Sequence, residues 1–260
     1  MKYTFLPFLV IPFIYGSEPS FFLEDAVVLD YEDFVLVDSS QPTYSDIDPS
    51  NAETVESYNL QSKLPASEKD KSLSFELWLN SIEKYYAGRK KENIQLLAIG
   101  SGNGVDADFL ASKGFSIERT DAAQGFVDLQ KKSGHKATLF NILTDEFPQP
   151  YDMIIMPTVL NEIEVKNWPL VIEKIKKILR PNDALALSFI YRNDTLTTET
   201  ITKKNCGRFH FHYMEQPEII AFLNKMNLAI VSTSERLGII GFIARKKLEG
   251  PLTLHTGHRN

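Results

Sequence analysis

Apolar strands alternate with amphipathic helices through the middle of this 260-residue chain, and this alternation constrains the fold more than any other feature. Helices are predicted by apolar residues three and four positions apart, and strands by short apolar runs. The predicted helices cover residues 72–86, 105–113, 124–132 and 168–179, and the predicted strands cover 94–99, 115–120, 137–140, 151–156 and 183–191. Continuous apolar strands separated by helices indicate an α/β fold, with a mostly parallel sheet and helices on both faces.

The carboxyl-terminal part of the pattern differs. A helix is predicted over residues 217–225, followed by strands over 228–233 and 239–244. Only residues 234–238 separate these two strands, whereas a parallel return needs a dozen residues or more. We therefore expect the sheet to end in a hairpin, with an antiparallel last strand.

A glycine-rich turn follows the first strand, in the segment LLAIGSGNGVD (96–106). Gly100, Gly102 and Gly104 permit a tight turn and let a ligand approach the backbone. Free amide groups at the start of the next helix can hold a carboxylate or phosphate. Ligands of parallel sheets bind at this carboxyl edge, where the strand order reverses.

Asp121 ends the second strand, seventeen residues after Gly104. A carboxylate at this position can accept hydrogen bonds from both hydroxyls of a ribose. The dinucleotide fingerprint GxGxxG would need glycine at position 105, which is Val105, so the spacing is GxGxG. Two other interpretations stay open, in which the glycines serve only strand-to-helix packing and Asp121 only caps a helix.

These motifs resemble the class I S-adenosylmethionine-dependent methyltransferases over residues 94–247. The resemblance extends to Asp106, to the segment LFNIL (139–143), to YDMIIMPTVLNEI (151–163) and to KKILRPNDALALSF (176–189), where Asn182 and Asp183 replace two glycines of the family pattern. It implies a Rossmann-like seven-stranded sheet, mostly parallel with an antiparallel last strand. It also implies a set of S-adenosylmethionine-binding residues: Gly100, Ser101, Gly102, Gly104, Asp121, Asn141 and Ile142. Asn141 could equally serve as a turn residue.

The resemblance further implies that a methyl group is transferred by in-line displacement to an acceptor, which we expect to be a small molecule or a side chain. Contacts to this acceptor are expected from the loops at 157–164 and 192–208, with the helix at 72–86 as a lid. The candidate acceptor-binding residues are Asn161, Glu162, Arg208 and Tyr213. The alternatives are a non-catalytic S-adenosylmethionine-binding protein and an NAD-dependent oxidoreductase.

The sequence after the fourth strand reduces the number of expected acceptor classes. Enzymes that methylate exocyclic amines of bases resemble one another in an Asn or Asp, two prolines and an aromatic residue here, but this chain has MPTV (156–159). Metal-dependent catechol-type enzymes place carboxylates at this strand end, where this chain has Met156 and Thr158. Neither acceptor class is expected.

The amino-terminal quarter has a different character. Residues 1–17 combine a lysine, an apolar run and small residues, as in a secretory signal peptide, which predicts export. The alternative is a cytoplasmic protein with an uncleaved apolar amino terminus. Residues 1–70 carry thirteen acids and three lysines, which gives a net charge of −10. Residues 71–260 carry twenty-one acids and twenty-five bases, which gives a net charge of +4. Residues 18–70 are thus predicted to be an acidic, mostly flexible segment, residues 71–248 the methyltransferase domain, and 249–260 a polar tail.

Composition also bears on metals and partners. One cysteine, Cys206, excludes a thiolate metal cluster and an internal disulfide framework, so no metal is expected. A body charge of +4 without a stripe of Lys and Arg disfavours nucleic acid as a partner. The apolar run near the amino terminus is shorter than the roughly 20 residues that a stable membrane span needs.

Overall fold

The computed structural model describes residues 49–64, 74–180, 182–192, 196–236 and 238–247. The predicted signal peptide at 1–17 and the polar tail at 249–260 lie outside these residues, so both stay predictions.

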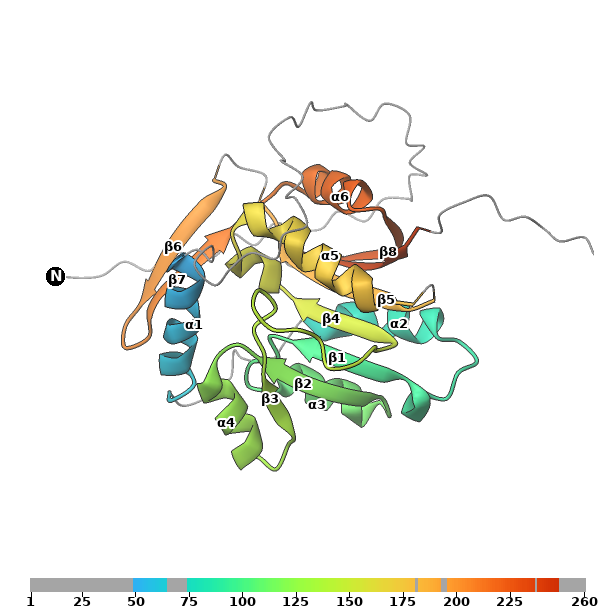
Figure 1. Ribbon diagram of the computed structural model, residues 1–260, viewed down its shortest axis with the longest axis horizontal. Helices are drawn as coiled ribbons and strands as arrows, with labels where there is room; N and C mark the ends of the chain where they lie inside the picture. Colours follow the sequence, from blue (N-terminus) through green and yellow to red (C-terminus); the bar gives the residue numbers. More distant parts are fainter. Residues whose placement is uncertain (1–48, 65–73, 181, 193–195, 237, 248–260) are drawn as a thin grey trace, which may run out of the picture. The chain divides into compact units, whose positions relative to one another are not determined.

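A seven-stranded sheet forms the centre of the domain, with the strand order β3-β2-β1-β4-β5-β9-β8 (Figure 1). Neighbouring strands from β3 to β5 are parallel, whereas β9 is antiparallel to both β5 and β8. The predicted α/β fold, mostly parallel with an antiparallel last strand, is confirmed. The strands are β1 (Gln95–Ile99), β2 (Ser116–Asp121), β3 (Ala137–Leu139), β4 (Met153–Pro157), β5 (Ala184–Ile190), β8 (Leu228–Arg236) and β9 (Ile239–Lys246).

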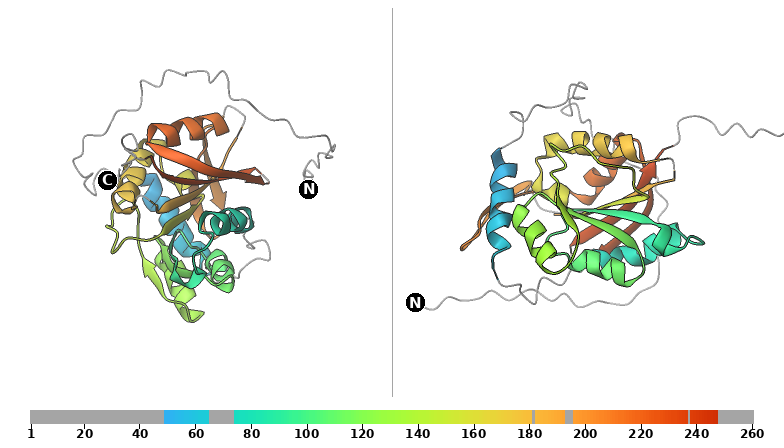
Figure 2. Two further views of the ribbon diagram at one scale, coloured as in Figure 1. Left: turned by 90° about the vertical axis from the view of Figure 1, so that its right-hand side faces the viewer. Right: turned by 60° about the horizontal axis from the view of Figure 1, so that its bottom comes forward.

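Helices cover both faces of this sheet (Figure 2), and two clusters of apolar side chains hold them there. One cluster joins Trp168 of α5 and Phe222 of α6 to Phe189 and Phe242 of the strands, and the other includes Trp78 of α2. The helices that follow α1 (Pro49–Gln61) are α2 (Ser74–Tyr85), α3 (Val105–Ser112), α4 (Gln124–Lys132), α5 (Trp168–Ile178) and α6 (Gln216–Lys225), with short 3-10 turns η3 (Lys91–Asn93), η4 (Val159–Glu162) and η5 (Val165–Asn167).

The predicted lid helix does not cover a site. The described side chains of α2 pack in the sheet core, where Trp78 lies so close to Gly241 of β9 that a Cβ on Gly241 would overlap the indole. None of these side chains lines the main cavity. The apolar face of α2 packs on the sheet. The prediction of a lid over residues 72–86 is therefore wrong for the described part of this helix.

Residues 49–61 form a helix, α1 (Pro49–Gln61), inside the segment predicted to be flexible. This helix lies beside β7 (Gly207–His212) and contacts α4 (Figures 1 and 2). Its buried residues are the small polar Asn51, Thr54 and Ser57. The Ser57 hydroxyl donates to the Arg208 carbonyl at 2.6 Å, and Thr54 Oγ1 accepts from the His210 amide at 3.1 Å. The flexible prediction fails here because hydrogen bonds of small polar side chains, together with the ring of Tyr58, dock this helix.

A second sheet replaces much of the loop predicted at 192–208. β6 (Thr198–Lys203) and β7 pair as an antiparallel hairpin that is separate from the main sheet. Its turn places Lys203, Lys204 and Cys206 at the main cavity. The hairpin and α1 together therefore build a wall that the strand and helix pattern did not predict.

Candidate active site

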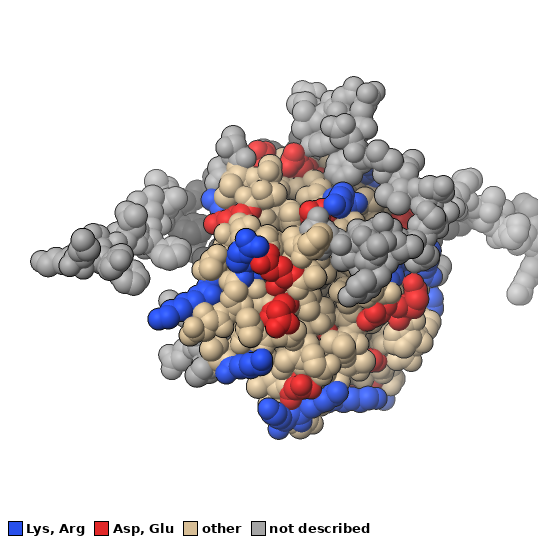
Figure 3. Space-filling model, turned by 60° about the vertical axis from the view of Figure 1, so that its left-hand side comes forward, with Lys and Arg blue, Asp and Glu red and all other residues tan. Residues whose placement is uncertain are grey.

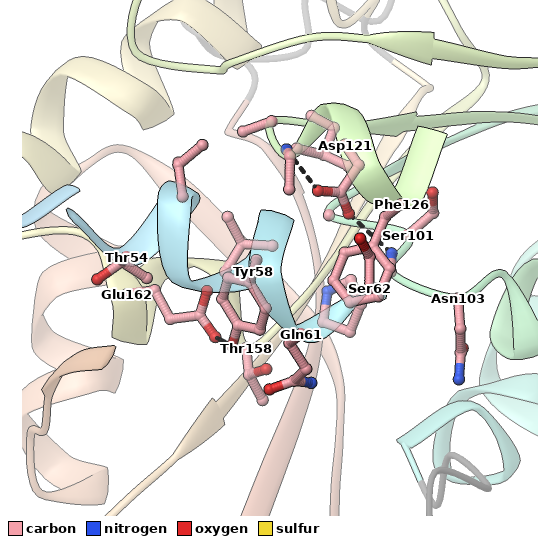
Figure 4. A pocket seen from close by; sticks show the side chains of 18 of the residues that line it. Thr54, Tyr58, Gln61, Ser62, Ser101, Asn103, Asp121, Phe126, Thr158 and Glu162 are labelled. Atoms are coloured by element: carbon pink, nitrogen blue, oxygen red, sulfur yellow. Dashed lines mark hydrogen bonds between the residues drawn. The ribbon is translucent and has the colours of Figure 1, made fainter. Parts of the chain in front are cut away.

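One cavity of about 690 Å³ opens at the carboxyl ends of β1, β2 and β4, with α1 across it (Figure 4). This is the edge where the strand order reverses, between β1 and β4. The volume lies within the range of about 300–1,000 Å³ that is usual for sites of drug-sized ligands. The glycine turn, the ends of β2 and β3, the turn after β4, the helix α1 and the β6–β7 turn all contribute to its lining.

Gly100 and Gly102 line the cavity in left-handed backbone conformations, with φ of 68° and 54°. A Cβ on Gly100 would lie 2.5 Å from Cγ2 of Val159, whereas one on Gly102 would meet nothing within 4 Å. Gly100 is therefore required both by its conformation and by the close packing of Val159. At Gly102, open space lies where a side chain would extend.

Asp121 faces this turn from the end of β2. Its Oδ2 accepts from the Gly102 amide at 2.8 Å, and its Oδ1 accepts from the Ala123 amide at 2.8 Å (Figure 4). Burial raises the pKa of this carboxyl to about 6, although the hydrogen bonds from Ala123 and Gly102 act in the opposite direction. Each carboxylate oxygen can accept a further hydrogen bond, so Asp121 can still bind a pair of hydroxyls.

Gln130 of α4 supports the glycine turn, and no sequence signal marked this residue. Its amide nitrogen donates to Ser101 Oγ at 2.9 Å and to the Gly102 carbonyl at 2.8 Å, and the residue is 1% exposed. Ser101 itself lines the cavity, whereas Gly104 does not and instead begins α3 as its N-cap. The buried side-chain amide of Gln130 in α4 thus holds the glycine turn in position.

Asn141 and Ile142 also line the cavity, directly after β3. The Asn141 side-chain oxygen accepts from the Leu143 amide at 3.0 Å, which is the turn role considered for this residue. Its side-chain amide points toward Asn51 of α1 at 3.5 Å. Asn141 thus combines a turn role with a place on the cavity wall.

Glu162 is the one acceptor-site candidate that lines the cavity within the described part of the chain. Its Oε1 accepts a hydrogen bond from the hydroxyl of Tyr58, a residue of α1 that sequence reasoning missed (Figure 4). Burial raises the pKa of Glu162 to about 7, Tyr58 lowers it, and nearby Asp121 raises it further. Burial and the charge of Glu162 also raise the pKa of Tyr58 well above its ordinary value. The proton of this pair therefore stays on Tyr58 when Glu162 ionises.

The other three acceptor-site candidates lie outside the cavity lining. Asn161 is 0% exposed, and its side chain exchanges hydrogen bonds with the Ile190 backbone and donates to the His212 carbonyl. Tyr213 is buried and donates to Glu199 at 3.0 Å. Arg208 is exposed and pairs through two nitrogens with Glu53 of α1. These side chains hold the hairpin and α1 in place.

Charges of both signs are interspersed on the described part of the face that carries α1 and the hairpin (Figure 3). Across the described residues, no group of three or more His, Cys, Asp and Glu side chains could hold a metal ion. Among the helices that the structure describes, none is long and apolar enough to cross a membrane.

Comparison with known proteins places the chain in a family. Residues 74–233 match a family model described as "Methyltransferase domain". The chain belongs to this methyltransferase-domain family. A search of curated proteins found no significant match.

Solved structures share the fold at low sequence identity. The DhpI-SAH complex is 14% identical with a TM-score of 0.55, covering 75% of this chain and 98% of DhpI. PH0226 from Pyrococcus horikoshii OT3 is 14% identical with a TM-score of 0.54, covering 66% and 89%. The glycopeptide N-methyltransferase MtfA complexed with S-adenosyl-L-methionine is 8% identical with a TM-score of 0.54, covering 70% and 100%. The predicted Rossmann-like methyltransferase fold is confirmed.

Proposed function

We propose that the protein transfers a methyl group from S-adenosylmethionine to a small-molecule acceptor by in-line displacement. The observation that carries the proposal is the pairing of Asp121 with the Gly102 amide at the open edge of the sheet. Membership of the methyltransferase-domain family supports it. DhpI and MtfA, whose structures contain SAH and S-adenosyl-L-methionine respectively, share the fold.

The residues of the cavity fit this cofactor. The turn at Gly100–Gly102 leaves its backbone uncovered by side chains. The charged methionine end of S-adenosylmethionine can therefore approach this backbone. Asp121 retains acceptor capacity for two ribose hydroxyls. Phe140 and Ile142 give an apolar surface, suited to a flat base, where β3 ends.

The chemistry needs little from the protein beyond alignment. When bound, S-adenosylmethionine supplies an activated methyl group on a sulfonium. Gly102 and Ala123 fix Asp121, and Gln130 fixes Ser101, so the binding groups keep their positions before a ligand arrives. Holding two reactants in line in this way removes much of the entropic part of the barrier.

A small acceptor fits the enclosure of the cavity. α1 and the β6–β7 turn both line the cavity, so the space beside a bound cofactor is limited. This limited space suits a small molecule better than a folded protein or a nucleic acid. We therefore place the acceptor between Tyr58, Glu162 and the β6–β7 turn.

Labelled methyl transfer tests this function. The protein is incubated with S-adenosylmethionine carrying a tritiated methyl group and with cell extract, which is then separated into small molecules and macromolecules. Label is expected in the small-molecule fraction, and Asp121→Ala should reduce it at least tenfold. Binding of the cofactor without transfer to either fraction would favour a non-catalytic binding protein, and label in protein would overturn the small acceptor.

A further inference from the structure

Three acidic residues of the described part of the chain line the cavity, and their surroundings differ. Asp121 is engaged by two backbone amides of the cofactor side, and Asp106 lies in the first turn of α3 beside the glycine turn. Glu162 lies on the other side of the cavity, in the η4 turn after β4. Its side chain accepts a hydrogen bond from the hydroxyl of Tyr58. Glu162 is thus the cavity carboxylate that belongs neither to the proposed cofactor-binding residues nor to the helix that follows the glycine turn.

Tyr58 reaches this carboxylate from a fixed position. Its ring packs edge-on against Phe209 of β7, with centroids 4.8 Å apart, and against Phe126 of α4 at 5.9 Å. Aromatic contacts on both sides restrict the ring, so the hydroxyl meets Glu162 in a defined geometry. Tyr58 precedes residues 74–233, the part that matches the family model, so α1 adds this contact to the shared domain.

The η4 turn that carries Glu162 is also held firmly. Thr158 begins this turn with a φ of 53°, and its amide donates to the carbonyl and to the hydroxyl of Ser188, both at 3.1 Å. The neighbouring Asn161 ties the turn to β5 and β7. Thr158 thus carries the backbone strain at the start of the turn, and residues in sparsely populated conformations cluster at functional sites.

We propose that Glu162 accepts the proton of the methyl acceptor, that Tyr58 positions its carboxylate, and that the acceptor is therefore an amine or a hydroxyl compound. This inference rests on the proposed function. As the lone pair of the acceptor nitrogen or oxygen forms its bond to the methyl carbon, the bond from that carbon to sulfur breaks and its electron pair stays on sulfur. The N–H or O–H proton of the acceptor passes to an oxygen of Glu162 and then to solvent.

The charges around Glu162 suit this role near neutral pH. The groups that act on it are Tyr58 from α1, Asp121 from β2 and Lys203 from β6. A pKa of about 7 leaves a large ionised fraction at neutral pH while keeping the carboxylate more basic than an ordinary one. Loss of the Tyr58 hydroxyl would raise this pKa further, because its hydrogen bond stabilises the ionised form.

Two non-reacting cofactor analogues test the position of Glu162. S-adenosylhomocysteine lacks the methyl group, and sinefungin carries an amine where that methyl would be. Titration calorimetry at pH 8 should show that the wild-type protein prefers sinefungin, because its ammonium group lies beside ionised Glu162. Glu162→Gln should reduce this preference at least fivefold. The matched control is Glu164→Gln, which removes an acid of the same loop that pairs with Lys166 outside the cavity lining and should leave the preference unchanged.

Tyr58→Phe separates a positioning role from packing. The ring and its aromatic contacts remain, but the hydrogen bond to Glu162 is lost. The sinefungin preference of the wild-type protein should appear as pH rises through about 7, and in Tyr58→Phe the midpoint should move to higher pH. An unchanged midpoint would overturn the assignment of Tyr58.

Transfer to the small-molecule fraction of cell extract tests the proton step itself. The wild-type rate should rise with pH and level off above about 7, whereas Glu162→Gln should lose at least tenfold in rate together with this pH dependence. A sinefungin preference or a rate that survives Glu162→Gln would overturn the inference while leaving the proposed function intact. Failure of S-adenosylhomocysteine to bind the wild-type protein would instead refute the proposed function and this inference with it.

Discussion

The two sides of the cavity are built by different means. On the proposed cofactor side, Gly100, Gly102 and Asp121 lie within one strand–helix–strand unit and are joined by short-range geometry. On the proposed acceptor side, α1 and the β6–β7 hairpin meet through polar contacts between residues about 150 positions apart, such as Ser57 with Arg208. We therefore expect the first side to tolerate few substitutions, whereas the second depends on several modest contacts. This difference sets the order of the expected effects.

Gly100→Ala should have the largest effect on stability. The left-handed conformation costs an alanine about 1–2 kcal/mol, and the clash with Val159 adds about 1–3 kcal/mol. The free energy of unfolding should thus fall by about 2–5 kcal/mol, as measured by denaturant titration. In a double-mutant cycle with Val159→Ala, the clash should appear as a coupling of about 1–3 kcal/mol. Additive effects would show that Val159 does not pack on Gly100.

Glu162→Gln should stabilise the protein at high pH. The pKa of Glu162 is raised from 4.5 to about 7 on folding, so the folded state binds the proton more tightly. The stability that this group contributes is greatest at low pH and declines as pH rises from about 4.5 to 7. The variant should therefore match the wild type near pH 4 and exceed it at pH 8, by at most about 3 kcal/mol. A wild type that is the more stable at pH 8 would contradict the burial of this carboxylate.

Gly125→Val tests whether α1 docks on α4. A Cβ on Gly125 would overlap Ser62 Oγ just beyond α1, and the Gly125 amide donates to Asn59 of α1 at 2.9 Å. The substitution should lower stability by about 1–2 kcal/mol and speed amide hydrogen exchange in residues 49–61. Asp128→Val, on the exposed side of the same helix, is the control. Equal exchange in both variants would mean that α1 is not held at Gly125.

Arg208→Ala should have the smallest effect. Arg208 pairs with Glu53, and together with His210 it holds the pKa of Glu53 below its usual value, but Arg208 is exposed to solvent and Glu53 is partly exposed. Exposed ion pairs are screened, so the thermal midpoint should stay within about 2 °C of the wild type. Methyl transfer should stay within about twofold, because Arg208 does not line the cavity. A loss of more than tenfold in transfer would restore Arg208 as an acceptor-binding residue.

The sequence allowed the main sheet and the glycine-turn side of the cavity to be predicted, because their signals are local. Apolar periodicity predicts strands and helices, and the glycine turn with Asp121 combines residue types whose chemistry is specific. α1 escaped prediction because its buried residues are small and polar and find their partners in β7.

The acceptor-site candidates also depend on long-range contacts that the sequence pattern could not predict. Asn161 and Glu162 are adjacent, yet one is satisfied by the backbone of β5 and β7 and the other lines the cavity. Which of two polar neighbours faces a ligand depends on the hairpin that packs over them, and that packing leaves no local pattern. Gln130 was missed for the same reason, since its role depends on the glycine turn above it.

Binding of S-adenosylhomocysteine, measured by titration calorimetry, tests the central claim most directly. The wild-type protein should bind one molecule, and Asp121→Ala should weaken binding at least tenfold because the ribose loses its acceptor. Asp128→Ala, an exposed acid of the neighbouring helix, should bind as the wild type does, and NAD should give no binding heat. Equal affinity of Asp121→Ala and the wild type, or tight binding of NAD in place of S-adenosylhomocysteine, would contradict the account.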